Sequence, residues 1–147
     1  MKNIKILLAD DDQDDREFFA EAISSLDLKY PVEYFKDGKE LLVRISNGDL
    51  VLPDLVFLDL NMPIMSGFET LEQIREDIRF NDIPVIVIYS TSPHPDGIIK
   101  AFGFGANAYI IKPISFNDLK TLLTKVLEMY SMHQFKQSTL ESFIISI

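Results

Sequence analysis

Charged and hydroxyl side chains follow four hydrophobic runs of the sequence, directly or one residue after each run ends. Three consecutive aspartates occupy positions 10–12, Asp59 and Ser90 follow two later runs, and Lys112 follows the last. Neighbouring carboxylates about 4 Å apart repel each other by roughly 1 to 4 kcal/mol, so they need a proton or a bound cation. Oxygen ligands favour a hard ion such as Mg²⁺, which commonly binds carboxylates together with phosphate oxygens. These residue types indicate a site for metal and phosphate, provided that the fold brings them together.

Each of these features also has a purely structural interpretation. A run of acids such as 10–12 is typical of a helix N-terminus, where negative charge is favourable. An aspartate after a strand, such as Asp59, can simply cap the following loop, and a lone Lys-Pro pair carries almost no information. The functional interpretation gains weight because all of these residues are expected at the same end of one sheet.

The pattern of hydrophobic residues predicts strands that alternate with helices along the chain. Short apolar runs predict strands at 4–9, 32–35, 55–58, 85–88 and 109–111. Helical periodicity predicts helices that begin near Asp14, Asp37, Ser66, Pro95 and Ser115. Capping boxes are predicted at Asp37 with Glu40 and at Ser66 with Glu69. Five strands and five helices in alternation give an α/β fold, with a parallel sheet covered on both faces. Ligands bind beyond the carboxyl ends of such strands, where positions 10–12, 59, 90 and 112 fall.

The composition is that of a folded soluble domain. The 147 residues are enough for one domain with a sizeable core and too few for two. No apolar run is long enough to span a membrane, and the first residues lack the cleavage pattern of a signal peptide. The absence of cysteine excludes disulfides and thiol catalysis and fits a reducing cytoplasm. A net charge of −9 at pH 7 argues against direct binding to DNA or anionic lipid.

Four segments, in order and with matching spacing, resemble the receiver domains of response regulators in two-component signalling. They are the start ILLADD at 6–11, the loop LDLNMP at 58–63 followed by Ser66-Gly67, the hydroxyl of Ser90, and GANAYIIKP at 105–113. The resemblance covers positions 2 to 133 and is closest to single-domain, chemotaxis-regulator-like members. It implies a flavodoxin-like, doubly wound five-stranded parallel sheet with strand order 2-1-3-4-5.

The resemblance also implies a role for each residue of the site. Asp59 would be the nucleophile that accepts a phosphoryl group from a phosphohistidine. Asp11 and Asp59 would bind Mg²⁺ through their side chains and Asn61 through its backbone carbonyl, whereas Asp10 would act through a metal-bound water. The ammonium of Lys112 would offset charge on the phosphoryl oxygens. Asp12 matches no ligand position of the family and is interpreted as an N-cap or a solvated acid.

A conformational switch is implied by two further positions. Ser90 would donate a hydrogen bond to the phosphoryl group, and Tyr109 would then turn inward, which changes the surface around the fourth helix, the fifth strand and the fifth helix. Tyr109 can equally be a plain core aromatic, since strands favour tyrosine. The family pattern further predicts a cis bond between Lys112 and Pro113.

The segment at 134–147 follows the expected receiver domain at 1–133. It is too short to be a separate output domain, so the signal is expected to leave through contact with another protein. The apolar end of the chain, FIISI at 143–147, could extend the last helix and form a homodimer contact, pack on its own chain or fray. The homodimer is the favoured alternative. The expected partners are a histidine kinase or phosphotransfer protein and an unknown downstream protein, in the cytoplasm.

Three rival functions remain open at this stage. A phosphatase of the haloacid dehalogenase type also has an aspartate nucleophile after a strand, but it needs a second aspartate where this chain has Asn61. A receiver-like docking module without phosphorylation would not need Asp10, Asp11, Asp59, Ser90 and Lys112. A flavin-binding protein of the same topology would need a phosphate-cradling loop where this chain has acids. The chain is therefore expected to catalyse only its own phosphorylation and dephosphorylation.

Overall fold

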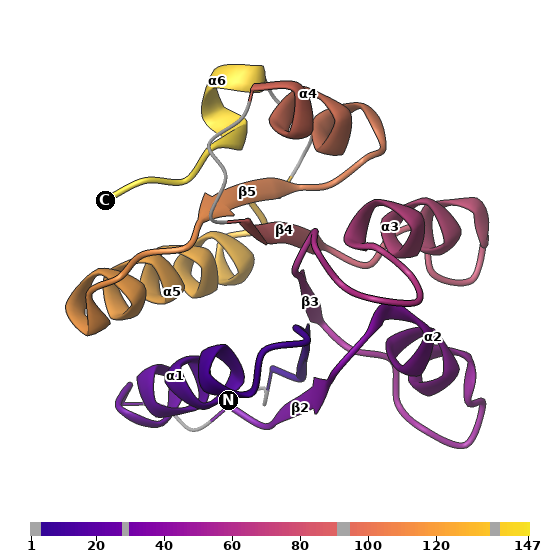
Figure 1. Cartoon of the computed structure of the whole chain (residues 1–147), viewed down its shortest axis with the longest axis horizontal. Helices are drawn as coiled ribbons and strands as arrows, with labels where there is room; N and C mark the ends of the chain where they lie inside the picture. Colours follow the sequence, from indigo (N-terminus) through magenta and orange to yellow (C-terminus); the bar gives the residue numbers. More distant parts are fainter. Residues whose placement is uncertain (1–3, 28–29, 91–94, 136–138) are drawn as a thin grey trace.

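The computed structural model describes residues 4–27, 30–90, 95–135 and 139–147 of the chain. A twisted sheet forms the middle layer, and helices cover both of its faces (Figure 1). The strands are β1 (Ile6–Ala9), β2 (Val32–Phe35), β3 (Leu55–Leu58), β4 (Val85–Ser90) and β5 (Ala108–Ile111). They pair in the order β2-β1-β3-β4-β5, and every pair is parallel. The predicted α/β class is confirmed.

The helices of the described residues alternate with these strands, and one short helix is added at the end of the chain. They are α1 (Gln13–Ser24), α2 (Gly38–Ser46), α3 (Gly67–Glu76), α4 (Pro95–Gly103), α5 (Phe116–Ser131) and α6 (Leu140–Phe143). The sequence predicted five helices and missed α6. A helix of four residues is too short to show helical periodicity in the sequence.

Side-chain caps decide where most of the helices begin. The carboxylate of Asp12 accepts hydrogen bonds from the first backbone N–H groups of α1, and Asp37 and Ser115 do the same for α2 and α5. Ser66 and Glu69 form the predicted capping box at α3. Since Asp12 is an N-cap, α1 starts one residue earlier than the sequence predicted, and its first turn lies directly after β1.

The sheet separates two hydrophobic cores. One contains Ile6 and Leu8 of β1 with the apolar faces of α1 and α5, and the other contains Leu7 and Ala9 with those of α2, α3 and α4. Successive strand residues point to opposite faces, so a strand buried on both sides has to be apolar throughout. This explains why every residue of β1 is apolar. It also leaves the ends of the strands as the place where polar side chains can gather.

The last residues of the chain pack on β5 and α4 of the same molecule. α5 ends where His133 adopts a left-handed backbone with φ of 54°, and Gln134 N then donates to the carbonyl of Met129. Ile144 forms a parallel bridge with Tyr109, whose carbonyl accepts a hydrogen bond from the backbone N–H of Ile145. Figure 1 shows α6 (yellow) beside α4 and above β5. Of the alternatives left open by the sequence, packing on the same chain is the one that this structure has.

The prediction of a cis bond between Lys112 and Pro113 was wrong. Every peptide bond among the described residues is trans. The trans form of a bond before proline is favoured by about 0.5 to 1 kcal/mol, so it needs no special support from the fold.

We expect Phe143→Ala to lower the free energy of unfolding by about 1 to 3 kcal/mol, because a buried aromatic ring is lost from the second core. Phe143 is 2% exposed, and its ring centroid lies 5.2 Å from that of Phe102 and 6.2 Å from that of Tyr109. Urea unfolding measures the change. Ile147→Ala is the matched control, since Ile147 is exposed in the same segment. Equal stabilities of the two variants would show that the segment does not pack as described.

Candidate functional site

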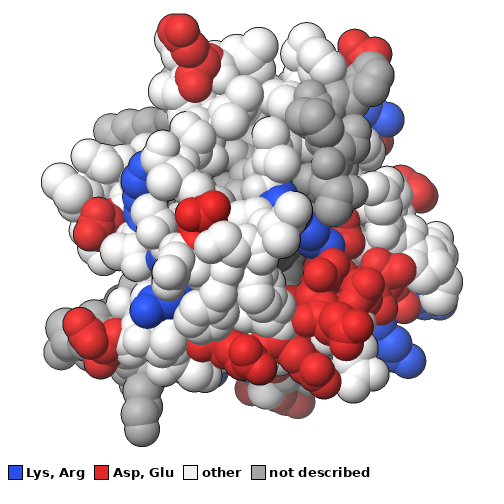
Figure 2. Space-filling view, turned by 60° about the vertical axis from the view of Figure 1, so that its left-hand side comes forward, with Lys and Arg blue, Asp and Glu red and all other residues white. Residues whose placement is uncertain are grey.

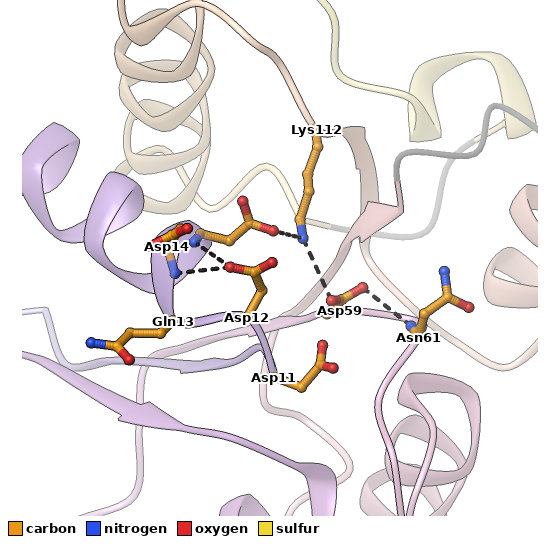
Figure 3. A pocket seen from close by; sticks show the side chains of 8 residues that line it. Asp11, Asp12, Gln13, Asp14, Asp59, Asn61 and Lys112 are labelled. Atoms are coloured by element: carbon orange, nitrogen blue, oxygen red, sulfur yellow. Dashed lines mark hydrogen bonds and ion pairs between the residues drawn. The ribbon is translucent and has the colours of Figure 1, made fainter.

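An open pocket of about 620 Å³ lies at the carboxyl ends of the central strands. Its lining consists of Asp11, Asp12, Gln13, Asp14, Asp15, Asp59, Asn61 and Lys112. Figure 2 shows how densely acidic side chains gather on one part of the surface. The lining residues come from the segment between β1 and α1, from the first turn of α1 and from the segments that follow β3 and β5, which are far apart in the sequence (Figure 3). The expected convergence at one edge of the sheet is therefore present.

Three aspartates bring their oxygen atoms together at this edge. Carboxylate oxygens of Asp10, Asp11 and Asp59 lie within 4.8 Å of one another. Asp10 is completely buried and Asp59 is 4% exposed, whereas Asp11 faces solvent. The group thus joins two carboxylates in the protein interior to a third at the surface of the pocket.

Backbone groups hold the two buried carboxylates in place. The N–H of Asp12 donates to Oδ1 of Asp10 at 3.0 Å, and the N–H of Asn61 donates to Oδ1 of Asp59 at 3.1 Å. Gly67 approaches the loop so closely that a Cβ there would lie 2.2 Å from the carbonyl oxygen of Asp59. Only glycine fits at that position, a physical role that the sequence did not reveal.

Lys112 places its ammonium group among three carboxylates. Its Nζ lies 2.6 Å from Oδ2 of Asp15, 3.0 Å from Oδ2 of Asp10 and 3.5 Å from Oδ2 of Asp59. In Figure 3 the lysine side chain extends from the end of β5 toward Asp59. Sequence reasoning missed Asp15, because nothing in the pattern separates it from the other acids in the first turn of α1.

Burial and mutual repulsion change the protonation of these groups. Burial and the neighbouring charge of Asp10 raise the pKa of Asp59 to about 7, against the smaller opposing effects of Lys112 and the Asn61 N–H. Burial also raises the pKa of Asp10. Burial alone would lower the pKa of Lys112, but the hydrogen bond to Asp15 and the charges of Asp10 and Asp59 raise it. The lysine is therefore fully charged at neutral pH and partly neutralises the acids.

The residues present fit a divalent metal ion. All the convergent ligand atoms are oxygens, which is the donor set of Mg²⁺. Two of the carboxylates are buried and Asp11 is open to the pocket, so an ion can enter from solvent. One ammonium group does not balance three clustered carboxylates, which leaves excess negative charge for a cation to offset.

The two predicted switch residues lie in different surroundings. Ser90 is the last residue of β4, next to β5, but its side chain lies outside the described residues. Tyr109 is 1% exposed and packs in the second core beside Phe143. The ring is thus already buried in this structure, and the end of the chain contributes part of its cover.

Comparison with protein families gives a match to the response regulator receiver domain over residues 6–124. The chain is 35% identical over 128 residues to a probable methanogenesis regulatory protein, FilR2 of Methanothrix harundinacea, covering 85% of this chain and 82% of that protein. It is also 35% identical over 127 residues to the chemotaxis protein CheY-3 of Vibrio cholerae, covering 86% and 94% of the two chains.

The fold agrees with that of solved receiver structures. The phosphorylated cyanobacterial phytochrome response regulator RcpA superimposes with a TM-score of 0.81 at 29% identity, over 90% of this chain and 96% of that one. No helix in the part of the chain that the structure describes is long and apolar enough to cross a membrane. The family match runs from β1 into the middle of α5 and includes every residue of the aspartate and lysine cluster. On these findings the chain belongs to the response regulator receiver family of two-component signalling.

Proposed function

We propose that Asp59 accepts a phosphoryl group from a phosphohistidine on a histidine kinase or phosphotransfer protein. Receiver domains are signalling modules that exchange signals with such kinases and with downstream proteins, and they bind Mg²⁺ at a cluster of aspartates. The observation that carries the proposal is the meeting of Asp10, Asp11 and Asp59 beside the Lys112 ammonium, at an open pocket.

The chemistry assigned to each residue follows from its position. An oxygen of Asp59 forms a bond to phosphorus while the bond from phosphorus to the donor's imidazole nitrogen breaks, and the electron pair stays on that nitrogen. Lys112, within 3.5 Å of Asp59, is placed to bind a phosphoryl oxygen. The side chains of Asp11 and Asp59 and the carbonyl of Asn61 would hold Mg²⁺, with Asp10 acting through water. The ion, when bound, offsets negative charge on the oxygens being transferred.

The switch would pass from the phosphoryl group to the face formed by α4, β5 and α5. Ser90 ends the strand next to β5 and is the proposed hydrogen-bond donor to the phosphoryl group. Tyr109 contacts Phe143, and its backbone binds Ile144 and Ile145, so a movement of Tyr109 would disturb residues 139–147. Residues 139–147 would therefore form part of the surface that a downstream protein binds.

The remaining assignments rest on the sequence and on this packing. We assign residues 1–133 to the receiver domain and 134–147 to a C-terminal tail, in which Ile144 and Ile145 pair with the edge of β5. A homodimer contact through this segment stays a prediction. The net charge of −9 supports the absence of direct DNA binding, and a cytoplasmic location is part of the proposal. Turnover is limited to the protein's own phosphoryl group, because Asn61 cannot shuttle the proton that a haloacid dehalogenase-type phosphatase needs.

Incubation with Mg²⁺ and acetyl phosphate is expected to add one phosphoryl group to the protein, detected by intact mass spectrometry. Asp59→Asn should add none, because an amide oxygen is too weak a nucleophile to replace the carboxylate. Asp49→Asn, at an exposed loop position, is the matched control and should react like the wild type. An Asp59→Asn protein that still gains the group would remove Asp59 from the mechanism.

Magnesium is expected to stabilise the folded protein, because it binds the assembled aspartates and not the unfolded chain. At a concentration tenfold above the dissociation constant the gain is about 1.4 kcal/mol, measurable as a shift in thermal unfolding that EDTA reverses. Asp11→Asn should lose most of this response. Asp12→Asn should keep the α1 cap, because an amide oxygen accepts the same backbone hydrogen bonds, and should also keep the response to magnesium. Equal responses of both variants to the metal would place the ion elsewhere.

Without divalent ions, Asp59→Asn is expected to be more stable than the wild type at pH 8, by about 1 to 4 kcal/mol at 1.36 kcal/mol per unit of pKa shift. The folded Asp59 keeps its proton up to a pKa of about 7, whereas the unfolded chain releases it near the ordinary value of 3.8. The free energy of unfolding of the wild type therefore falls as pH rises from 4 to 7, and then levels off.

Urea unfolding in EDTA at several pH values, from below the ordinary pKa of 3.8 up to pH 8, measures the difference between the two proteins. It should be large at pH 8 and should shrink toward zero as the pH falls below the ordinary pKa of 3.8, where Asp59 is protonated in both states. A difference that does not change with pH would mean that the ionisation of buried Asp59 is not its source.

A further inference from the structure

Lys112 is bound more closely by a residue outside the aspartate cluster than by the proposed phosphorylation site. Its Nζ lies 2.6 Å from Oδ2 of Asp15 and 3.5 Å from Oδ2 of Asp59. Asp15 belongs to the first turn of α1, close behind the Asp12 cap, and its side chain is 39% exposed. Its carboxylate lines the same pocket as the cluster. The shortest ion pair of the site therefore draws the lysine toward α1.

This ion pair competes with the role that Lys112 has in the proposed function. A phosphoryl group on Asp59 places new, highly charged acceptor oxygens in the pocket, and Lys112 is the cation that reaches Asp59 and Asp10 there. An ammonium group has three N–H donors, and Asp15 holds one of them at short range. Whatever Lys112 gains by binding a phosphoryl oxygen is reduced by what it loses in leaving Asp15.

We propose that Asp15 is a positioning residue that holds Lys112 away from Asp59 and thereby weakens the phosphorylated state. This inference rests on the proposed phosphorylation of Asp59. Because Asp15 is partly exposed, its pairing with Lys112 is screened by water, and the effect is modest. An ion pair of this kind changes an equilibrium constant by on the order of two- to fivefold.

The test measures binding of beryllofluoride, a phosphoryl mimic, at saturating Mg²⁺ by calorimetric titration. Asp15→Asn keeps the size of the side chain and removes its charge, so it should bind beryllofluoride about two- to fivefold more tightly than the wild type. A residue with only a structural role would not tighten binding when it is changed. Binding of Mg²⁺ alone should not tighten, because the change removes a negative charge from the pocket.

Two further variants distinguish the effect of the Asp15–Lys112 ion pair from the effect of removing one negative charge from the pocket. Asp14→Asn removes the same charge from the same turn of α1, lines the same pocket and has an exposed side chain, so it gives the purely electrostatic effect. Asp15→Glu restores the charge and should return the affinity toward that of the wild type. Asp15→Asn behaving like Asp14→Asn, or Asp15→Glu behaving like Asp15→Asn, would overturn the inference.

The wild-type protein provides a test that needs no variant. In a crystal structure with Mg²⁺ and beryllofluoride, Lys112 is expected to contact a fluoride and to have left ion-pair distance of Asp15. A lysine that contacts fluoride while Asp15 keeps its short contact would contradict the competition. If the wild type binds no beryllofluoride at all, the proposed function itself fails, which is a different result from equal binding by wild type and Asp15→Asn.

Discussion

Repulsion between carboxylates at the carboxyl edge of the sheet is the constraint on which this structure depends. Asp10 and Asp59 are buried close together; burial opposes the ionisation of both, and the charge of Asp10 further opposes that of Asp59. Lys112 offsets part of that charge, and the open side of the pocket leaves room for a cation at Asp11. The protein thus gives up stability in the metal-free state to keep a site ready for metal and phosphate. Such local cost at a functional site is a general property of proteins.

The rest of the fold holds this arrangement in place. The two hydrophobic cores hold β1, β3 and β5 in one parallel sheet, with β4 between β3 and β5, so that the residues after these strands lie at the same edge. The Asp12 cap starts α1 at the edge of the pocket, and the close approach of Gly67 fixes the loop after Asp59. Phe143 and Ile145 pack in the two cores beside β5, the strand that leads into Lys112. The site and the end of the chain are therefore both attached to β5, because Lys112 follows the carboxyl end of this strand and Ile145 bonds to Tyr109 along its edge.

The sequence predicted the parts of this structure that local patterns determine. Continuous apolar runs predicted β1 and β3 because both faces of those strands are buried, and Ser66 with Glu69 predicted the start of α3. The convergence of Asp11, Asp59 and Lys112 followed from the rule that parallel strands end at one edge. The pairing of Lys112 with Asp15 could not be predicted from the sequence. Three acids lie close together at the start of α1, and the sequence does not show which of their side chains points toward the lysine. The packing of Phe143 on Tyr109 also depends on contacts between residues that no local pattern connects.

The central claim is that clustered carboxylates, held together by the fold, carry excess negative charge in the absence of metal. A carbon-13 NMR titration of the aspartate carboxyl groups measures this directly, with and without Mg²⁺. The account predicts that Asp59 titrates near pH 7 without divalent ions, and that its pKa falls when Mg²⁺ is added. An Asp59 carboxyl that titrates at the ordinary value of 3.8 and does not respond to Mg²⁺ would contradict it.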